Sequence, residues 1–339
     1  MDKGMAVLKD GTIAGSVLKM KDSLRNILAF TDATLADVVQ MGAINPALQC
    51  GVDRKGSLEA GKDADFIVLN EKNELVLTVC RARLPIKKKR WIELKIVSVT
   101  DNQEMSKKAA GIIRELVLRK PDAVLGLATG GTPEGTYQQL VKDHQENGTS
   151  YRSIRTVNLD EYAGIDPKDP NSYYAYMKQH FFDHVDLPDG QYFLPNGLDT
   201  SKEACMRYDA LIDSLGGVDL QLLGIGRNGH IGFNEPGSSL TLGTHVVKLT
   251  ESTRHANARY FGSIEDVPTE AVTMGIGTIL KSRKILLIAS GEEKADALGK
   301  LVLANRADSR FPASALTQHK NVIIIADEAA LSQTKVSKD

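Results

Sequence analysis

Cysteine is scarce in this sequence of 339 residues, which contains three, Cys50, Cys80 and Cys205. They are widely spaced and form no CxxC pair, so the pattern argues against a structural zinc site and against a framework of disulfides. This usage of cysteine predicts a protein of a reducing compartment.

Long apolar runs and an excess of charge of one sign are also lacking. No uninterrupted apolar stretch approaches the ~20 residues that a membrane-spanning helix needs, and the N-terminus lacks the apolar core of a secretory leader. The formal net charge is -1, which argues against nucleic acid as a partner and leaves any attraction for an anion to local groups. We therefore expect a cytoplasmic protein that binds neither nucleic acid nor a membrane.

The composition is that of a globular protein with a sizeable core, because 42% of the residues are hydrophobic and 25% are charged. The length predicts more than one domain. Pro85 is followed by four successive cations at 87–90, which repel one another and disfavour compact structure. We predict an N-terminal segment over 1–85, a basic linker over 86–92 and a main domain over 93–339.

Apolar strands alternate with amphipathic helices in the main domain. The expected helices cover about 104–118 and begin near 133 and 292, and the expected strands are 94–99, 123–129, 156–159, 219–226, 285–290 and 322–326. Such alternation predicts an α/β fold with an open, mostly parallel, doubly wound sheet that carries helices on both faces. The N-terminal segment would add a small α/β part.

A glycine turn follows the second of these strands. Thr129, Gly130, Gly131 and Thr132 precede Pro133, where a helix is expected, with Thr132 as its N-cap. Bare backbone N–H groups beside the positive end of a helix favour an anion, most simply a phosphate. The spacing fits neither the Walker pattern nor the dinucleotide fingerprint, and two glycines before a helix are more often only a tight turn.

Three further strand ends carry reactive side chains. Asp160 follows the strand 156–159, His230 and Glu235 lie in the loop after 219–226, and Lys294 opens the helix after 285–290. Each has an ordinary structural explanation: a capping aspartate, an incidental loop histidine, a solvated lysine. Because parallel strands bring their carboxyl ends to one edge, we expect these groups to converge there on a ligand.

The motifs together resemble those of glucosamine-6-phosphate deaminases over about 94–339. The resemblance rests on five stretches in this order: Gly126 to Pro133, Asn158 to Tyr162, Ser172 to Tyr174, Gly224 to Pro236 and Ala256 to Arg259. It implies a modified Rossmann-like fold and conversion of glucosamine 6-phosphate to fructose 6-phosphate and ammonia, a step of amino-sugar catabolism.

The resemblance also implies roles for individual residues. His230 would be the acid–base group that opens the sugar ring, with Asn228 and Glu235 orienting it, and Asp160 would move the proton from C2 to C1. Thr129, Gly130, Gly131, Thr132, Arg259 and Lys294 would bind the substrate, chiefly its phosphate. The implied chemistry needs no metal and no cofactor.

Two departures from the family pattern carry consequences. Many relatives have Asp where this chain has Asn228, and an amide supplies no charge to the neighbouring histidine, so we expect activity with a shifted pH optimum. In allosterically activated hexameric relatives, basic residues bind the activator at positions that correspond to His245 and Val247. A valine binds no phosphate, so we expect no activation by N-acetylglucosamine 6-phosphate.

The oligomeric state stays open between a monomer and a homo-oligomer.

Residues 1–85 resemble the C-terminal end of N-acetylglucosamine-6-phosphate deacetylase. The similar stretches are Gly11 to Ser16, Arg25 to Asn26, Asn45 to Ala47 and Gly56 to Phe66. Such deacetylases bind metal through histidines, whereas the first histidine of this chain is His144. We expect a noncatalytic remnant with a helix near 35–41 and a strand near 65–69, without the barrel on which these elements would pack.

Two other functions fit part of the pattern. A 6-phosphogluconolactonase shares the architecture and a Gly-His loop, but is not expected to have the motifs at 158–162 and 233–236. A sugar-phosphate-sensing regulator without turnover would need a DNA-binding module, and residues 1–92 show no convincing helix-turn-helix.

Overall fold

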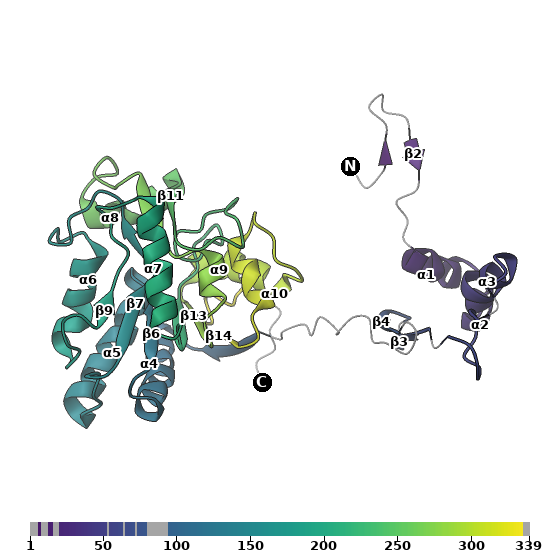
Figure 1. The fold of residues 1–339 in the computed structure, drawn as a ribbon, viewed down its shortest axis with the longest axis horizontal. Helices are drawn as coiled ribbons and strands as arrows, with labels where there is room; N and C mark the ends of the chain where they lie inside the picture. Colours follow the sequence, from purple (N-terminus) through teal and green to yellow (C-terminus); the bar gives the residue numbers. More distant parts are fainter. Residues whose placement is uncertain are drawn as a thin grey trace. The chain divides into compact units, whose positions relative to one another are not determined.

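A computed structural model describes residues 6–7, 13–15, 20–52, 54–63, 65–71, 73–79 and 94–334 of the chain (Figure 1). The chain divides into two compact units, Met1–Arg90 and Trp91–Asp339. The basic linker expected at 86–92 lies outside the described residues. In the described part of the chain, no helix is long and apolar enough to cross a membrane.

The N-terminal unit is built from short elements. Its described helices and strands are β1 (Ala6–Val7), β2 (Ile13–Gly15), α1 (Met20–Phe30), α2 (Leu35–Val39), the π-helical turn η1 (Gln40–Ile44), α3 (Asn45–Gln49), β3 (Phe66–Leu69) and β4 (Leu75–Val79). β1 pairs with β2 and β3 with β4, both antiparallel. A capping box formed by Thr34 and Asp37 fixes the start of α2. The helix and the strand expected in this segment are confirmed in α2 and β3.

A seven-stranded sheet forms the centre of the larger unit. Its spatial order is β5-β14-β13-β10-β6-β7-β9, and every pair in it is parallel. The strands are β5 (Lys95–Val99), β6 (Val124–Leu127), β7 (Arg155–Asn158), β9 (Tyr192–Phe193), β10 (Leu220–Leu223), β13 (Ile285–Ala289) and β14 (Val322–Asp327). Fully buried apolar strands such as β10 and β13 are typical of a sheet that is covered on both faces.

Helices cover both faces, so the predicted doubly wound α/β fold is confirmed (Figure 1). One apolar cluster contains residues of α4 (Asn102–Arg119), α5 (Gly131–Asn147) and α6 (Tyr173–His180). The cluster on the other face contains residues of α7 (Lys202–Ser214), α9 (Ile276–Ile279) and α10 (Ala295–Leu303). The remaining helical elements are η2 (Phe182–His184), α8 (Glu251–Phe261), η3 (Glu292–Lys294) and η4 (Pro312–Gln318).

A second sheet, which the sequence pattern did not predict, has the antiparallel order β11-β12-β8. Its strands are β8 (Asp160–Tyr162), β11 (His245–Lys248) and β12 (Glu270–Thr273). The chain leaves the parallel sheet at the end of β7 and enters this sheet directly at β8. Asp160 therefore begins a buried strand instead of a loop.

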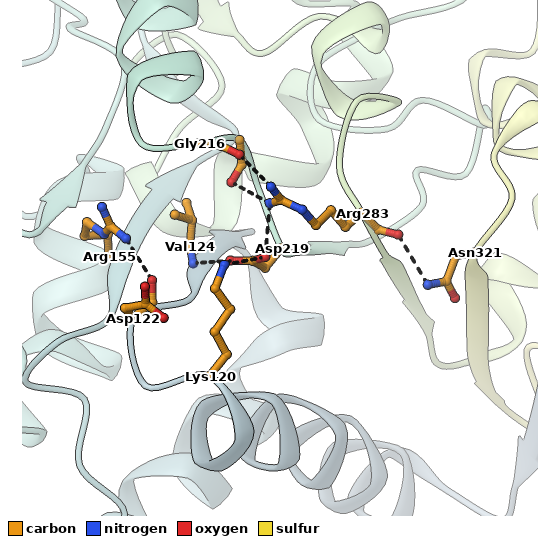
Figure 2. A network of polar contacts seen from close by, with 9 residues as sticks. Lys120, Asp122, Val124, Arg155, Gly216, Asp219, Arg283 and Asn321 are labelled. Carbon is orange, nitrogen blue, oxygen red and sulfur yellow. Dashed lines mark hydrogen bonds and ion pairs between the residues drawn. The ribbon is translucent and has the colours of Figure 1, made fainter.

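A charged network joins the amino ends of the parallel strands (Figure 2). Asp219, just before β10, is only 7% exposed and accepts hydrogen bonds from Lys120 Nζ, from the backbone N–H of Val124 and from Arg283 Nη1. Burial works against ionisation of Asp219, but these donors outweigh it and lower its pKa. One carboxylate thus holds together the segments that open β6, β10 and β13.

Candidate active site

The carboxyl ends of the parallel strands surround a pocket of about 230 Å³. It lies where the strand order reverses, because β6 and β10 are neighbours in space while their connections run to opposite sides of the sheet. The loops after β6, β7, β10 and β13 all contribute lining residues, as does α8. The expected convergence of separate strand ends on one site is therefore observed.

The glycine turn lines one end of this pocket. Gly130 has a φ of 99°, in the region that favours glycine, and it is the N-cap of α5, which begins at Gly131. Thr132 therefore lies inside the first turn and is not the N-cap, so that prediction was wrong. The N-cap makes no side-chain hydrogen bond, so the start of this 17-residue helix is left without a side-chain cap where Gly131 and Thr132 line the pocket.

Asp160 also lines the pocket and is 6% exposed. Burial, together with the neighbouring Glu161 carboxylate, raises the pKa of Asp160 to about 8. Its position is fixed by β12, since Thr273 is its partner in the antiparallel register. A Cβ atom on Gly232 would lie 3.5 Å from Asp160 Oδ2, so the carboxylate borders the loop that carries His230.

Glu161 ties the strand of Asp160 to helix α6. Its carboxylate accepts hydrogen bonds from the backbone N–H groups of Tyr173 and Tyr174, at 3.0 Å each. Tyr173 lines the pocket, and the hydroxyl of Tyr176 donates to the carbonyl of Gly130 over 2.7 Å. The first turns of α6 are thus anchored both to β8 and to the glycine turn.

His230 is presented by a tight turn after β10. The backbone N–H of Gly226 donates to the carbonyl of His230, and the backbone N–H of Gly229 donates to Gly226, each over 2.9 Å. The imidazole lies against Gly226, where any Cβ atom would collide with the ring. Asn228 Oδ1 accepts from the backbone N–H of His230 over 3.1 Å, so this amide holds the turn and does not bond the ring itself.

Glu235 lies beneath the imidazole and is 5% exposed. Its Oε2 accepts from Asn228 Nδ2 over 2.6 Å and lies 3.6 Å from His230 Nδ1, a distance at which the contact with the ring is electrostatic. Thr253 Oγ1 donates to the other carboxylate oxygen. Burial opposes ionisation, but His230, Thr253 and Asn228 together lower the pKa of Glu235 to about 2. The loop therefore holds a permanent negative charge beside the imidazole.

Two cations accompany the glycine turn. Arg259, in the last turn of α8, is close to Gly131, since a Cβ atom there would lie 3.3 Å from Nη2. Lys294 is the N-cap of α10 and is presented by a turn that Asp327 organises, because Asp327 accepts from Ser290 Oγ over 2.5 Å and from the backbone N–H of Gly291 over 3.1 Å. Burial lowers the pKa of Lys294.

The structure brings the predicted site residues together. Nine of them line the pocket, namely Thr129, Gly130, Gly131, Thr132, Asp160, Asn228, His230, Arg259 and Lys294. Glu235 completes the set through its contacts with Asn228 and His230. Within the described residues, no group of three or more acidic, histidine or cysteine side chains has a geometry that would hold a metal ion.

Several lining residues escaped the sequence analysis. Arg227 and Glu293 form an ion pair between the loops after β10 and β13, and Asn257 and Thr253 line the pocket from α8. In the sequence, Arg227 directly precedes Asn228 and Glu293 directly precedes Lys294. This adjacency to predicted site residues was the signal that could have identified them. Tyr173 lines the pocket and also packs against an apolar cluster that contains Tyr162 and Phe233.

A family described as glucosamine-6-phosphate isomerases/6-phosphogluconolactonase matches residues 101–325. The amidohydrolase family matches residues 2–106. The two matches fall mainly in the larger and the smaller unit, respectively.

Similar proteins cover the larger unit at high identity. A glucosamine-6-phosphate deaminase of Geobacillus sp. (strain WCH70) is 59% identical over 240 residues, which is 70% of this chain and 95% of that protein. Glucosamine-6-phosphate deaminase 1 of Bacillus subtilis (strain 168) is 55% identical over 240 residues, or 70% of this chain and 99% of that protein.

Solved structures of similar proteins also match this chain. A monomeric glucosamine-6-phosphate deaminase is 54% identical, covers 71% of this chain and all of its own, and superposes with a TM-score of 0.69. A 6-phosphogluconolactonase from Trypanosoma cruzi, 19% identical with a TM-score of 0.60 and covering 72% of this chain and 98% of its own, shares the fold.

Proposed function

The chain belongs to the glucosamine-6-phosphate isomerase/6-phosphogluconolactonase family, and from this membership and the geometry of the pocket we propose that it deaminates glucosamine 6-phosphate to fructose 6-phosphate and ammonia. The observation that carries the proposal is that Asp160 and His230, which follow separate strands, line the same pocket as the glycine turn, Arg259 and Lys294. The enzyme acts in amino-sugar catabolism.

The phosphate ester is bound at the glycine turn. The free N–H groups at the start of α5 and the positive end of its dipole favour an anion there. Arg259 and Lys294 add charge-assisted hydrogen bonds, and Lys294 is held in a largely buried position. Anchoring the phosphate orients the sugar, so that its C1 and C2 atoms lie toward Asp160 and His230.

His230 opens the sugar ring. Its imidazole accepts the proton of the C1 hydroxyl and delivers a proton to the ring oxygen as the C1–O5 bond breaks, which yields the open-chain aldehyde. The ionised Glu235 at 3.6 Å stabilises the cationic form of the ring during this exchange. Asn228 contributes by holding the turn through the backbone of His230 and by donating to Glu235.

Asp160 then catalyses the isomerisation. As a carboxylate it removes the proton from C2, and the C1 oxygen takes a proton from the C2 ammonium group, which gives an enolamine. Asp160 then returns its proton to C1. The product carries CH2OH at C1 and an iminium group at C2. Water adds to C2, ammonia leaves, and fructose 6-phosphate remains. An aspartate whose pKa is raised to about 8 is a much stronger base than a solvated one, which suits the abstraction of a proton from carbon.

The lactonase alternative is less well supported. Hydrolysis of a lactone does not require a base at C2, whereas a buried aspartate, Asp160, lines this pocket. A regulator that binds the sugar phosphate without turnover would need neither Asp160 nor the ionised Glu235 beside His230.

An ammonia assay distinguishes the three functions. The full chain is incubated with glucosamine 6-phosphate, and ammonia and fructose 6-phosphate are measured. Stoichiometric release of both supports the proposal. Hydrolysis of 6-phosphogluconolactone without ammonia release favours the lactonase, and binding of the sugar phosphate without any turnover favours the regulator.

We propose further that residues 1–85 are a deacetylase-like segment that is not catalytic in this chain. The support is the match of the amidohydrolase family to residues 2–106, together with a sequence that holds no histidine before His144. Metal-dependent hydrolysis of an acetamide needs ligands to activate a water. Release of acetate from N-acetylglucosamine 6-phosphate by the full chain would refute this assignment.

We also propose a cytoplasmic location and a monomeric state. The substrate is a phosphorylated metabolite, and the low content of cysteine suits a reducing compartment. The similar structure described as a monomeric deaminase favours a monomer over a homo-oligomer. Size-exclusion chromatography with light scattering tests the oligomeric state.

A further inference from the structure

Four charged side chains gather at the phosphate end of the pocket, and the proposed reaction assigns roles to only two of them. Arg259 and Lys294 are substrate ligands in the mechanism, whereas Arg227 and Glu293 are not. Arg227 comes from the turn after β10, and Glu293 from the turn after β13, which is the neighbouring strand of the sheet. Their ion pair therefore bridges two loops that form the pocket.

Glu293 is shared between two cations. Its Oε2 contacts Arg227 Nη2, while its Oε1 lies 3.7 Å from Lys294 Nζ, which is beyond a normal hydrogen bond. The lysine side chain is only 16% exposed, so little water competes for its ammonium group. If the Glu293 carboxylate moved closer to Lys294, it would neutralise the lysine ammonium and occupy the position where the phosphate would bind.

The charges at this end of the pocket match those of the substrate. Three cationic side chains and one carboxylate leave a net charge of two positive, which a phosphate monoester dianion balances. The Glu293 carboxylate is ionised in this arrangement. Burial opposes its ionisation, but Arg227 and Lys294 outweigh burial and lower the pKa of Glu293. If Glu293 turned fully toward Lys294, Arg227 would lose its ion-pair partner, and Lys294 would be paired with Glu293 instead of with the phosphate.

We propose that Arg227 is a positioning residue of the phosphate site, which holds Glu293 aside and thereby leaves the Lys294 ammonium available to the phosphate ester. The inference rests on the proposed function, because it assumes that the anion is the phosphate of the sugar. Arg227 acts through Glu293 and does not touch the substrate. Its effect lies in the binding of the phosphate and not in the proton transfers at C1 and C2.

A double-mutant cycle tests this role in the full chain, with Arg227→Gln, Glu293→Gln and the combined variant. We expect Arg227→Gln to raise KM for glucosamine 6-phosphate about fivefold, with kcat changed less than about twofold, since the pair is partly exposed and screened by solvent. In the Glu293→Gln background the same substitution should raise KM less than about twofold. Arg227→Lys, which keeps the charge, should restore most of the affinity.

Arg207→Gln is the matched control. Arg207 is 66% exposed, against 65% for Arg227, and pairs with Asp199 away from the pocket. We expect its KM to equal that of the wild type. Thermal unfolding of all variants verifies that they are folded.

Two outcomes would overturn the inference: an unchanged KM in Arg227→Gln, or an equal rise of KM in both backgrounds, which would mean that Arg227 binds the phosphate itself. If the wild-type chain released no ammonia, the proposed function would fail separately. The same proteins would then be titrated with inorganic phosphate by calorimetry, and the same pattern of dissociation constants would decide the role of Arg227.

Discussion

Replacing Asp160 with asparagine should abolish turnover and at the same time stabilise the protein. The amide keeps the shape of the side chain but accepts no proton, so we expect kcat to fall by about 10²- to 10⁴-fold. Binding should persist, because the proposed ligands of the phosphate are Arg259 and Lys294 and not Asp160. Steady-state ammonia release and calorimetric titration with glucosamine 6-phosphate measure the two effects.

The gain in stability follows from the raised pKa. Asp160 has an ordinary pKa of 3.8 when unfolded and about 8 when folded, so the folded state binds the extra proton between these values. The contribution of this group to stability is complete below pH 3.8 and is lost as the pH rises through about 8. The loss amounts to about 1.4 kcal/mol per pH unit within that window, or roughly 4 kcal/mol between pH 5 and pH 8.

Urea unfolding of the wild type and of Asp160→Asn at pH 5 and pH 8 measures this quantity directly. The variant should gain stability relative to the wild type as the pH rises. In the wild type, kcat/KM should also increase about tenfold per pH unit on the acid side until Asp160 ionises near pH 8. A difference in unfolding free energy that does not depend on pH, or a variant that still releases ammonia, would refute the assignment of Asp160 as the buried base.

Three further predictions concern other parts of the chain. Lys294→Met should raise KM about 10- to 100-fold by removing a charge-assisted hydrogen bond to the phosphate, and an unchanged KM would place the phosphate elsewhere. Asp219→Ala should lower the free energy of unfolding by about 1–3 kcal/mol while KM stays constant, as urea titration and kinetics can show. N-acetylglucosamine 6-phosphate should leave the rate curve hyperbolic, since Val247 offers no ligand for it; a sigmoidal curve that this compound converts to a hyperbolic one would contradict the expectation.

Much of the parallel sheet could be predicted from the sequence, because its strands are apolar runs that end at glycines or polar residues. β10 and β13 are buried on both faces, and such strands leave a clear apolar signal. The candidate site followed from the same signal, since the ends of parallel strands meet at one edge. Asp160 and His230 could be placed in a common pocket on that basis alone.

The second sheet could not be predicted, because its strands are short and their pairing is non-local. β8 reads Asp-Glu-Tyr, and β11 begins with a histidine and ends with a lysine, so neither shows an apolar pattern. The start of α5 was misplaced for a different reason. Thr132 is a favourable N-cap by residue type, but the left-handed conformation of Gly130 starts the helix at Gly131.

The ion pair between Arg227 and Glu293 could not be predicted from the sequence either. Both residues lie in turns, and their separation of 66 positions along the chain gives no sign that they meet. The ion pair depends on β10 and β13 being neighbours in the sheet. Only the assembled fold reveals that an ion pair joins the turn that carries His230 to the turn that carries Lys294.

Strand β12 carries none of the proposed catalytic residues, yet it contacts the segments that carry two of them, Asp160 and His230. Thr273 is the register partner of Asp160, and its hydroxyl accepts the backbone N–H of Phe233 in the histidine loop over 3.1 Å. The next residue, Met274, accepts from Asn234 Nδ2 over 2.9 Å. Random mutagenesis followed by a screen for loss of growth on an amino sugar should therefore find inactivating changes at Thr273, although this residue does not line the pocket.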